Sequence, residues 1–423
     1  MLDHVDSYAG DPIFSLTEAV AADKRAHKAN LGVGLYFDED GQVPLMRAVG
    51  RAQQELAEER RAKAYLPMEG LASYRAAVQS LLFGDSHEAV TSGRVATIQS
   101  VGGSGALKVG ADFLRRYFPD SGVWVSDPTW DNHHAILEGA GFRVSTYPYY
   151  DPVRRRLDFE GMLSALDSLP ARSIVLLHAC CHNPSGVDLS QAQWLQVLSV
   201  IVHRRLLPFF DFAYQGFAEG QDEDAWVLRY LAESGETFLV ANSFSKNFGL
   251  YSERCGALSI VAKSAGVAER VLGQLKATVR RNYSNPPSHG ASIVARVLES
   301  PALRAEWQSE LQTMRDRIRQ MRQGLCDGLS AELPGLDLSF LRSQKGMFSF
   351  TGLTPSQVQR LRVEHGIYMV GSGRACIAGL NAGNLRHVIA AMAAVMSDGG
   401  LPTTSPVGTS SREASLAVAA PLP

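Results

Sequence analysis

The chain has 423 residues, of which 45% are hydrophobic and 20% are charged, and its formal net charge is −2. This length predicts two packed domains, or one large domain with an appended lobe. The nearly neutral charge gives no reason to expect nucleic acid or an anionic membrane as a partner.

The sequence also carries indications of where the protein resides. Residues Met1 to Ser7 have neither the basic start nor the apolar core of a secretory signal. No apolar run reaches the roughly 18 residues needed to cross a bilayer. The five cysteines follow no regular spacing, which is typical of reduced thiols in a cytosolic enzyme. We therefore expect a cytoplasmic protein.

Short apolar runs, rich in β-branched and aromatic residues, alternate with helical patterns through the middle of the chain. The expected strands span residues 95–99, 123–126, 143–147, 173–178, 207–212, 238–241 and 257–261. The expected helices between them include 105–117, 134–139, 191–204 and 225–234. This alternation predicts an α/β fold with right-handed crossovers and a mainly parallel sheet, and ligands bind such sheets at the carboxyl ends of the strands.

The pattern changes after about residue 300. A long, charged, amphipathic helix is expected at 301–329, and it is followed by Phe348-Ser-Phe-Thr and a segment at 354–396. We interpret this region as a second, smaller lobe. The last residues, 399–423, are rich in Pro, Ser, Thr and Ala, a composition that predicts a disordered tail.

A glycine-rich turn, Gly102-Gly103-Ser104-Gly105, joins the first expected strand to its helix. Small residues let backbone N–H groups approach a phosphate, and the start of a helix favours an anion through its dipole. Lys108 stands where a dinucleotide-binding motif would have its third glycine, and the P-loop pattern is absent as well. The turn is therefore a candidate phosphate site, although such junctions are often only structural.

The segment His178-Ala-Cys180-Cys181-His182-Asn183 contains four side chains of the kind that bind metals. Alternation along a strand would put His178, Cys180 and His182 on one face and Cys181 on the other. Consecutive residues do not easily surround a tetrahedral ion, and no second Cys/His pair is suitably spaced, so we expect no metal. Asn183, at the turn, is the better candidate, as a hydrogen-bond donor to an oxygen on a ligand ring.

The strand expected at 207–212 brings Asp211 to its end, and Tyr214 follows three residues later. A carboxylate there could keep a pyridinium nitrogen protonated, and the tyrosine could hydrogen-bond a phenolic ring oxygen. Trp130 offers a face on which a planar ring could stack, and His133 could support Asp211 by a hydrogen bond. The structural alternatives are a turn-capping carboxylate for Asp211 and core packing for Trp130.

One lysine, Lys246, lies among small and hydroxyl residues in Ser243-Phe-Ser-Lys-Asn-Phe-Gly, and Arg254 follows eight positions later. A lysine acts as a nucleophile when burial or a nearby cation keeps its amine partly neutral. Arg254 could be that cation, and with Ser243 it could hold a phosphate. This combination suggests a Schiff base with pyridoxal phosphate (PLP). The Ser-x-x-Lys pattern of penicillin-binding proteins also matches, but the two further triplets it requires are absent.

Two arginines complete the candidate set. Arg374 stands among small residues in Gly-Ser-Gly-Arg-Ala, where a guanidinium could bind a carboxylate through two hydrogen bonds. Arg280 precedes Arg281-Asn-Tyr-Ser. Most arginines are solvated surface groups, so neither residue identifies a site without its context.

Taken in order from about Asp11 to Met396, these segments resemble the class I aminotransferases of PLP fold type I. The likeness is greatest to the bacterial tyrosine (aromatic amino acid) branch of the aspartate aminotransferase subfamily. The matching segments are Tyr65-Leu-Pro-Met-Glu-Gly, Ala96-Thr-Ile-Gln, Gly102-Gly-Ser-Gly-Ala-Leu-Lys, Asp127-Pro-Thr-Trp, Cys180-Cys-His-Asn-Pro-Ser-Gly, Asp211-Phe-Ala-Tyr-Gln-Gly, Ser245-Lys-Asn-Phe-Gly-Leu-Tyr and Arg280-Arg-Asn-Tyr-Ser.

The resemblance implies a mainly parallel central sheet flanked by helices, with a smaller α/β domain. It divides the chain into an N-terminal arm at 1–11, a small domain at 12–43 and 314–398, a large PLP-binding domain at 44–313, and the tail at 399–423. It also implies a homodimer whose active sites are shared, with Tyr65 and Arg280 reaching the site of the neighbouring subunit.

The roles of individual residues are likewise implied by the resemblance. Lys246 forms the internal aldimine with PLP and later moves the substrate proton. The cofactor ring meets Asp211 at its nitrogen, Tyr214 and Asn183 at its oxygen, and Trp130 on its face. The cofactor phosphate is held by Gly103, Ser104, Ser243, Arg254 and Tyr65. Arg374, with Gly34 nearby, binds the substrate α-carboxylate; Trp130 and Asn183 also face the substrate, and Arg280 meets an ω-carboxylate. His133 and His178 support Asp211.

The implied activity is a ping-pong transfer of the amino group of tyrosine or phenylalanine to 2-oxoglutarate, with aspartate also accepted. Residues that look like the aromatic branch are Leu35, Phe37, Val43 and Ser104. Arg280 and Asn285 instead resemble the aspartate enzymes. Three alternatives remain: an aspartate aminotransferase with mainly dicarboxylate specificity, a lyase or decarboxylase built on the same residues, and a non-catalytic descendant.

Overall fold

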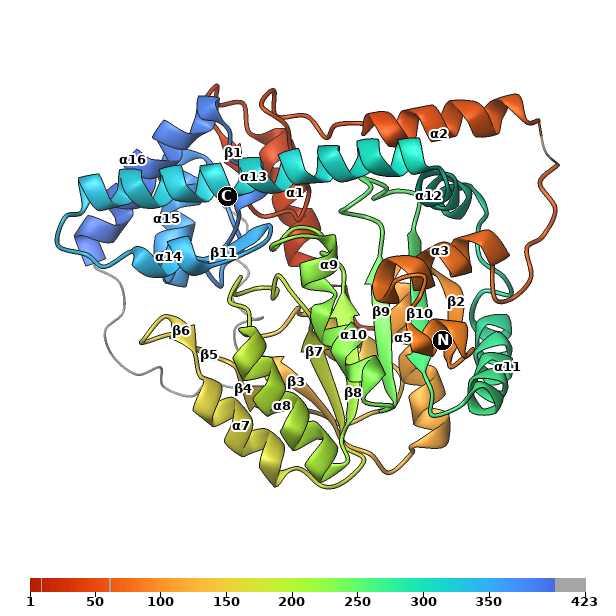
Figure 1. Cartoon of the computed structure of the whole chain (residues 1–423). Coiled ribbons are helices and arrows are strands. Elements are labelled where there is room, and N and C mark those ends of the chain that lie inside the picture. Colours follow the sequence, from red (N-terminus) through yellow and green to blue (C-terminus); the bar gives the residue numbers. More distant parts are fainter. Residues whose placement is uncertain (9, 61, 400–423) are drawn as a thin grey trace.

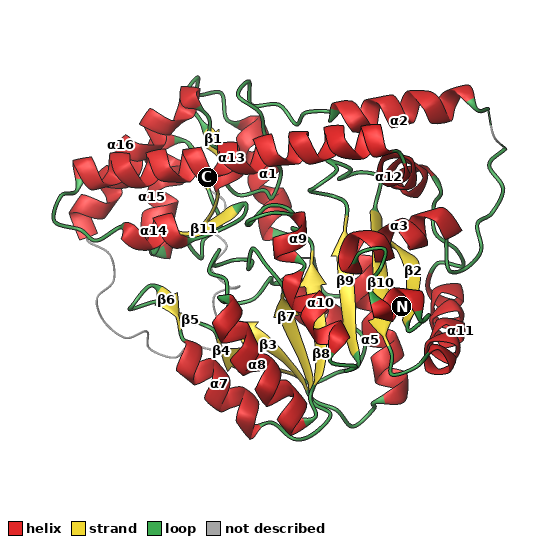
Figure 2. Ribbon diagram, viewed as in Figure 1, coloured by secondary structure: helices red, strands yellow, loops and turns green. Residues whose placement is uncertain are grey.

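The computed structural model describes residues 1–8, 10–60 and 62–399. A seven-stranded sheet forms the centre of the larger part of the molecule, and helices cover both of its faces (Figure 1, Figure 2). The strand order is β2-β10-β9-β8-β7-β3-β4. These strands are β2 (Val95–Val101), β3 (Val123–Asp127), β4 (Val144–Pro148), β7 (Ile174–His178), β8 (Leu207–Phe212), β9 (Phe238–Ser243) and β10 (Cys255–Val261). The expected fold class is confirmed.

All strands of the central sheet run parallel except β10, which is antiparallel to both β2 and β9. The segment 244–254 that joins β9 to β10 contains no helix. A parallel return needs a crossover connection of a dozen or more residues, usually a helix, so a short connection reverses the strand. The carboxyl ends of β7, β8 and β9 therefore lie side by side, and His178 is aligned with Asp211.

The sheet buries apolar side chains on both faces. Along β8, Phe209 belongs to the core under α5 (Gly102–Tyr117), whereas Phe210 belongs to the larger core on the opposite face. Both rings are fully buried. Strands that are covered on two sides carry continuous apolar runs, which is why Leu-Pro-Phe-Phe predicts a central strand. The same alternation recurs at Leu176 and Leu177 in β7.

The remaining helices of the larger part lie around this sheet. They are α2 (Arg47–Glu58), α3 (Ala72–Phe83), α4 (Glu88–Thr91), α6 (Asn132–Glu138), α7 (Phe159–Ser168), α8 (Gln191–Arg204), α9 (Gln221–Asp224), α10 (Trp226–Glu233), α11 (Ala265–Asn282) and α12 (His289–Glu299). A short hairpin is formed by β5 (Tyr150–Asp151) and β6 (Arg156–Leu157). Helix α8 has the expected bounds, and its capping box of Ser190 and Gln193 accounts for its start.

A long helix, α13 (Pro301–Glu332), links the larger part to the smaller lobe (Figure 1). Ser300 caps it, because its hydroxyl accepts a hydrogen bond from the Leu303 N–H at 3.4 Å, and Pro301 occupies the first turn. The lobe contains α1 (Pro12–Ala22), α14 (Ser339–Ser343), α15 (Pro355–His365), the short helix Ile377–Gly379 and α16 (Ala382–Gly399). Its strand pairs are parallel β1 (Ala29–Asn30) with β12 (Ile367–Tyr368) and antiparallel β11 (Phe348–Phe350) with β13 (Arg374–Cys376).

Two expectations concern features at the edge of the described structure or beyond it. The tail expected at 399–423 lies outside the described residues, apart from Gly399 at the end of α16. Within the described part of the chain, no helix combines the length and apolar character that a membrane span requires.

Candidate active site

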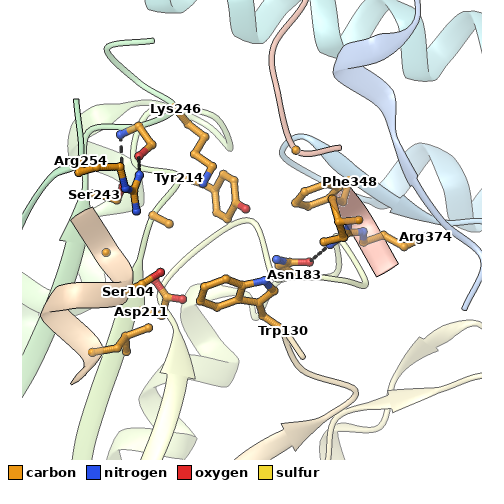
Figure 3. A pocket seen from close by; sticks show the side chains of 16 residues that line it. Ser104, Trp130, Asn183, Asp211, Tyr214, Ser243, Lys246, Arg254, Phe348 and Arg374 are labelled. Atoms are coloured by element: carbon orange, nitrogen blue, oxygen red, sulfur yellow. Dashed lines mark hydrogen bonds between the residues drawn. The ribbon is translucent and has the colours of Figure 1, made fainter. Parts of the chain in front are cut away.

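A cavity of about 220 Å³ lies at the carboxyl ends of the central strands, where the smaller lobe meets the sheet (Figure 3). All but two of the residues expected to bind the cofactor or the substrate line it. These are Gly34, Gly103, Ser104, Trp130, Asn183, Asp211, Tyr214, Ser243, Lys246, Arg254 and Arg374. The strand ends that carry Asp211 and Ser243 are neighbours in the sheet, so the fold itself brings the carboxylate and the hydroxyl to one edge.

Asp211 is buried and lies at the end of a chain of hydrogen bonds. Nε2 of His133 is 3.0 Å from Oδ2 of Asp211, and Nδ1 of His133 is 2.8 Å from Oγ1 of Thr129. A neutral imidazole satisfies both contacts when Nε2–H donates to the carboxylate and the threonine hydroxyl donates to Nδ1. His133 therefore supports Asp211 by a hydrogen bond, as expected.

The surroundings of Asp211 favour its ionised form. Burial alone would raise the pKa of Asp211, but the hydrogen bond from His133 and the positive charge of the neighbouring Lys246 hold that pKa below its ordinary value. His178, whose ring centre is 5.3 Å from that of His133, stays neutral because burial lowers its pKa to about 3. The site thus presents a buried anion to whatever group occupies the cavity.

Lys246 lies across the cavity, with its Nζ 5.5 Å from the centre of the Tyr214 ring. Burial lowers the pKa of Lys246 to about 8; Asp211 opposes this shift, and Arg254 and Arg374 add to it. Loss of hydration is therefore the main cause, and the nearby arginine is a smaller one. A substantial fraction of the amine is neutral near pH 7 to 8, so it can act as a nucleophile or a base.

An anion cradle is formed by the start of α5, by Ser243 and by Arg254. Gly102 has a φ of +68°, and a Cβ added to it would lie 2.5 Å from Nη2 of Arg254. Only glycine lets the backbone pass this close to the guanidinium. A Cβ on Gly103 would be 3.2 Å from the Cβ of Ser243. The helix start, the serine hydroxyl and the guanidinium therefore converge on one small volume.

Arg254 is a cation without an acidic partner among the described residues. Its Nη1 donates to Oγ of Ser245 at 3.3 Å and to the carbonyl oxygen of Tyr251 at 3.0 Å. No carboxylate lies within ion-pair distance of this guanidinium in the described part of the chain. A phosphate is a suitable counter-ion for such a group, because phosphate oxygens accept charge-assisted hydrogen bonds from arginine.

Arg374 lies on the side of the cavity opposite Lys246 (Figure 3). It is 5% exposed; Nη1 donates to Oδ1 of Asn183 at 3.1 Å and Nη2 to the carbonyl of Gly32 at 2.9 Å. Its Cζ is 4.3 Å from the centre of the Phe348 ring, and its buried Nε has no hydrogen-bond partner. A buried guanidinium that meets only neutral groups is prepared to bind a carboxylate.

Sequence reasoning missed several residues of the cavity, namely Ile13, Leu107, Ala213, Ser245 and Phe348. Phe348 shapes the site most, because it lies against Arg374 and because a Cβ on Gly34 would be 2.9 Å from its ring. The pairing of β11 with β13 brings these distant segments together. The alternation of Phe348-Ser-Phe350 is the signal that could have indicated a strand here, but nothing in it indicates which partner that strand has.

Tyr65 and Arg280 do not line the cavity of their own chain. Tyr65 is 91% exposed, and Arg280, at the end of α11, is also exposed and hydrogen-bonds Oγ of Ser284. Their proposed roles need a second subunit and stay predictions.

Two groups of metal-binding side-chain types occur among the described residues: His133 with His178 and Asp211, and Cys180 with Cys181 and Asp224. The expectation that the two cysteines face opposite sides of a strand is wrong. Strand β7 ends at His178, and both sulfur atoms lie near the carbonyl oxygen of Tyr214, at 3.7 and 3.9 Å.

Asp224 already has a structural role. Its two oxygens accept hydrogen bonds from the backbone N–H groups of four residues, Gly216, Ala218, Glu219 and Gly220. These bonds use its acceptor capacity to hold the loop that follows Tyr214.

Comparisons with known proteins agree with this geometry. The sequence model of the family described as aminotransferase class I and II matches residues 26–392. The aromatic-amino-acid aminotransferase of Escherichia coli (strain K12) is 56% identical over 94% of this chain and 100% of its own length.

Two solved structures are similarly close. One is an aromatic-amino-acid aminotransferase of Burkholderia pseudomallei covalently bound to pyridoxal phosphate, with 53% identity, a TM-score of 0.91, and coverage of 93% of this chain and 99% of that one. The other is an aromatic amino acid aminotransferase of Psychrobacter sp. B6 cocrystallised with aspartic acid, with 49% identity, a TM-score of 0.93, and coverage of 94% and 100%.

Proposed function

Since the chain belongs to the class I and II aminotransferases, we propose that it is a PLP-dependent enzyme that moves the amino group of aromatic L-amino acids, and of aspartate, to 2-oxoglutarate. The single observation that carries this proposal is one cavity that combines a desolvated lysine, a buried ionised aspartate, an anion cradle and a buried arginine without a carboxylate.

The residues of the cavity fit PLP. Ser104, Ser243 and Arg254, with the start of α5 at Gly103, would hold its phosphate. Asp211 would pair with the ring nitrogen, Tyr214 and Asn183 would meet the ring oxygen, and Trp130 would cover the ring face. When bound, the cofactor supplies an electron sink for the negative charge left at the substrate Cα.

Side chains of the protein bind the substrate, move the proton and exclude water. Arg374 binds the substrate α-carboxylate and so fixes the direction of the Cα–H bond. Lys246 takes the proton from Cα through its neutral amine and later returns one to the bound intermediate, which requires a pKa near the working pH. Asp211 stays ionised and keeps the ring nitrogen protonated. Trp130 and Phe348 exclude water from the reacting atoms.

Dual specificity rests on the outer end of the site. A carboxylate on the substrate side chain would draw Arg280 of the neighbouring subunit inward, whereas an aromatic side chain would bury its apolar area and leave that arginine in solvent. Two similar proteins support both classes of donor, since the E. coli relative is an aromatic-amino-acid aminotransferase and the Psychrobacter one was crystallised with aspartic acid. Arg280 is also the residue that supports the alternative function, an aminotransferase with mainly dicarboxylate specificity.

We also propose a homodimer in which Tyr65 and Arg280 complete the partner's site. The exposure of Tyr65, of Leu45 at 66% and of Val43 at 41% supports a contact surface at this end of the chain. The division into an arm at 1–11, a small domain at 12–43 and 314–398, and a large domain at 44–313 belongs to the same proposal. Five buried cysteines, none of them in a disulfide, support a cytoplasmic location.

The test is an absorption spectrum of the purified protein, followed by tyrosine and aspartate added separately under single-turnover conditions. The proposal predicts that both donors convert the aldehyde form of the cofactor to the pyridoxamine form and that 2-oxoglutarate reverses this change. Conversion by aspartate alone would favour the dicarboxylate enzyme. A lyase or decarboxylase would release its product without return of the cofactor by 2-oxoglutarate, and failure to take up PLP would contradict the proposal altogether.

A further inference from the structure

A second cavity, of about 410 Å³, lies apart from the candidate active site. Three segments form it: the loop at 217–219 after β8, one face of α13, and the segment at 342–346 that leads into β11. We call it the α13 crevice. Its charged lining residues are Glu219, Arg319, Arg322, Arg342 and Lys345. Four cations therefore face a single carboxylate.

The carboxylate of Glu219 is already shared between two of these cations. It is 2.5 Å from Nη2 of Arg319 and 2.9 Å from Nζ of Lys345. Arg342 pairs with Asp327 at 2.6 Å, a residue outside the crevice lining. All of these partners are about half exposed, so water screens their attraction and leaves them able to turn toward another anion. Arg322 is the cation that none of these acids reaches.

Arg322 is 3% exposed, and all of its hydrogen bonds go to neutral acceptors. Its Nε donates to Oγ of Ser349 at 3.2 Å, and its Nη2 donates to the carbonyl oxygens of Gly346 and Phe348. Nη1 donates no hydrogen bond to any described residue, and protein atoms do not fully enclose it. This nitrogen therefore keeps access to the crevice.

The described chain has two other buried arginines, Arg94 and Arg374. Arg94 pairs with Glu88. Arg374 has no carboxylate partner, lines a cavity and has a spare donor, which are the features expected of a substrate-binding arginine. Arg322 shares all three features, in a different cavity. A buried guanidinium without a hydrogen-bonded carboxylate is costly. The charge of Asp188 offsets part of this cost, and an anion in the cavity would offset more of it.

We propose that the α13 crevice binds a small oxyanion of the phosphate class, held by Nη1 of Arg322 together with Arg319, Arg342 and Lys345. Guanidinium and ammonium groups that approach from two segments, α13 and the segment at 342–346, suit a compact anion with several oxygens. The anion would join α13 to the segment that leads into β11. Arg322 also donates a hydrogen bond to the carbonyl oxygen of Phe348, whose ring lies against Arg374. Phe348 therefore contacts the buried arginines of both cavities.

The test is isothermal titration of inorganic phosphate into the PLP-loaded protein in chloride buffer. Because Arg322 also supports the backbone, the informative variant is the double substitution Arg342→Gln/Lys345→Gln, at two exposed positions. It should weaken phosphate binding by about tenfold or more, because two charge-assisted contacts are lost. The matched control is Arg360→Gln/Lys263→Gln, which removes the same charge outside the crevice and should bind phosphate like the wild type.

Two further titrations separate the crevice from the candidate active site and identify the source of the anion. Arg374→Leu should retain phosphate binding if the crevice is the site. A titration with glycerol phosphate is compared with the titration with inorganic phosphate. Tighter binding of glycerol phosphate would identify a phosphate monoester as the ligand, and tighter binding of phosphate would identify the free ion. The proposal is overturned if the wild type binds neither ion, if the Arg342/Lys345 variant binds phosphate as tightly as the wild type, or if Arg374→Leu alone abolishes binding. None of these results depends on transamination.

Discussion

The inner and outer ends of the candidate active site are built in different ways. At the inner end, Asp211 and Ser243 occupy neighbouring strand ends, and Lys246 follows three residues after Ser243. At the outer end, Arg374 belongs to β13, Gly34 to a loop of the smaller lobe and Ile13 to α1. The reactive groups thus lie at the ends of neighbouring strands or in the loop directly after β9, while the groups that recognise substrate come from distant segments. We infer that chemistry and specificity can be changed separately.

The two ends also differ in whether their hydrogen-bonding groups have partners within the chain. At the inner end, hydrogen bonds from His133 and Thr129 already satisfy the groups that hold Asp211. At the outer end, Arg374 keeps a buried Nε without a partner, and Arg280 remains in solvent. The hydrogen bonds around Asp211 are thus made within one chain, whereas the arginines of the outer end keep unused donors. Substitutions at the inner end and of Arg374 should therefore affect all substrates, whereas substitution of Arg280 should affect substrates unequally.

The largest effect is expected from Lys246→Ala. Turnover should fall by about 10⁴-fold or more with both tyrosine and aspartate, since no other side chain at the inner end can move the proton from Cα. Single-turnover spectra should show substrate binding without release of the oxo acid. Lys263→Ala, at an exposed position, is the control and should behave like the wild type. Normal turnover by the Lys246 variant would refute the assignment.

Two substitutions at the outer end should have different patterns across the substrates. Arg374→Leu should lower kcat/KM by about 10² to 10³-fold for every substrate, because each loses the partner of its α-carboxylate. Arg280→Leu should produce a similar loss for aspartate and 2-oxoglutarate but leave the half-reaction with tyrosine within a few-fold. Equal losses for tyrosine and aspartate in the Arg280 variant would show that this arginine does not discriminate.

The pH dependence of cofactor attachment tests the desolvation of Lys246. Burial lowers the pKa of Lys246 to about 8, so the neutral, reactive amine becomes the major form above that pH. The rate of covalent PLP attachment to the cofactor-free protein should rise with pH and level off above about 8, instead of above the ordinary lysine value near 10.4. A rate that is still rising tenfold per pH unit at pH 9.5 would contradict a desolvated amine.

The smallest effect is expected from His133→Leu. The imidazole helps to lower the pKa of Asp211, and without it burial should raise that pKa. Protonation of Asp211 would then begin at higher pH, so the acidic limb of the kcat profile should move upward while the alkaline limb stays in place. Thr129→Val, which removes only the outer hydrogen bond, should cause a smaller shift in the same direction. An unchanged acidic limb would show that His133 does not tune Asp211.

The inner end could largely be predicted from the sequence, because its residues occur in short segments with local chemical logic. The strand β8 has the predicted bounds, and Lys246 and Arg254 lie within one loop. Strand β9 runs two residues beyond its predicted end at Ala241. Asn242 and Ser243 have the polarity of a loop, yet both are buried and pair with β10.

The outer end could be predicted only through resemblance. The contact of Phe348 with Arg374 depends on the pairing of two three-residue strands, and such short segments have too little pattern to indicate a partner. Ile13 enters the cavity from a helix near the N-terminus. The roles of Tyr65 and Arg280 depend on a second subunit, because both side chains are exposed in the single chain.

Combining two impaired variants in one dimer tests most directly whether the outer end of the site is completed by the partner subunit. Lys246→Ala and Arg280→Leu chains would be co-expressed with different tags, and turnover of tyrosine with limiting 2-oxoglutarate measured on the mixture. If Arg280 serves the partner's site, each hybrid dimer contains one intact site, and random pairing should restore about a quarter of the wild-type activity. If each site is built from one chain, the mixture should be no more active than the two variants alone, which would contradict the account.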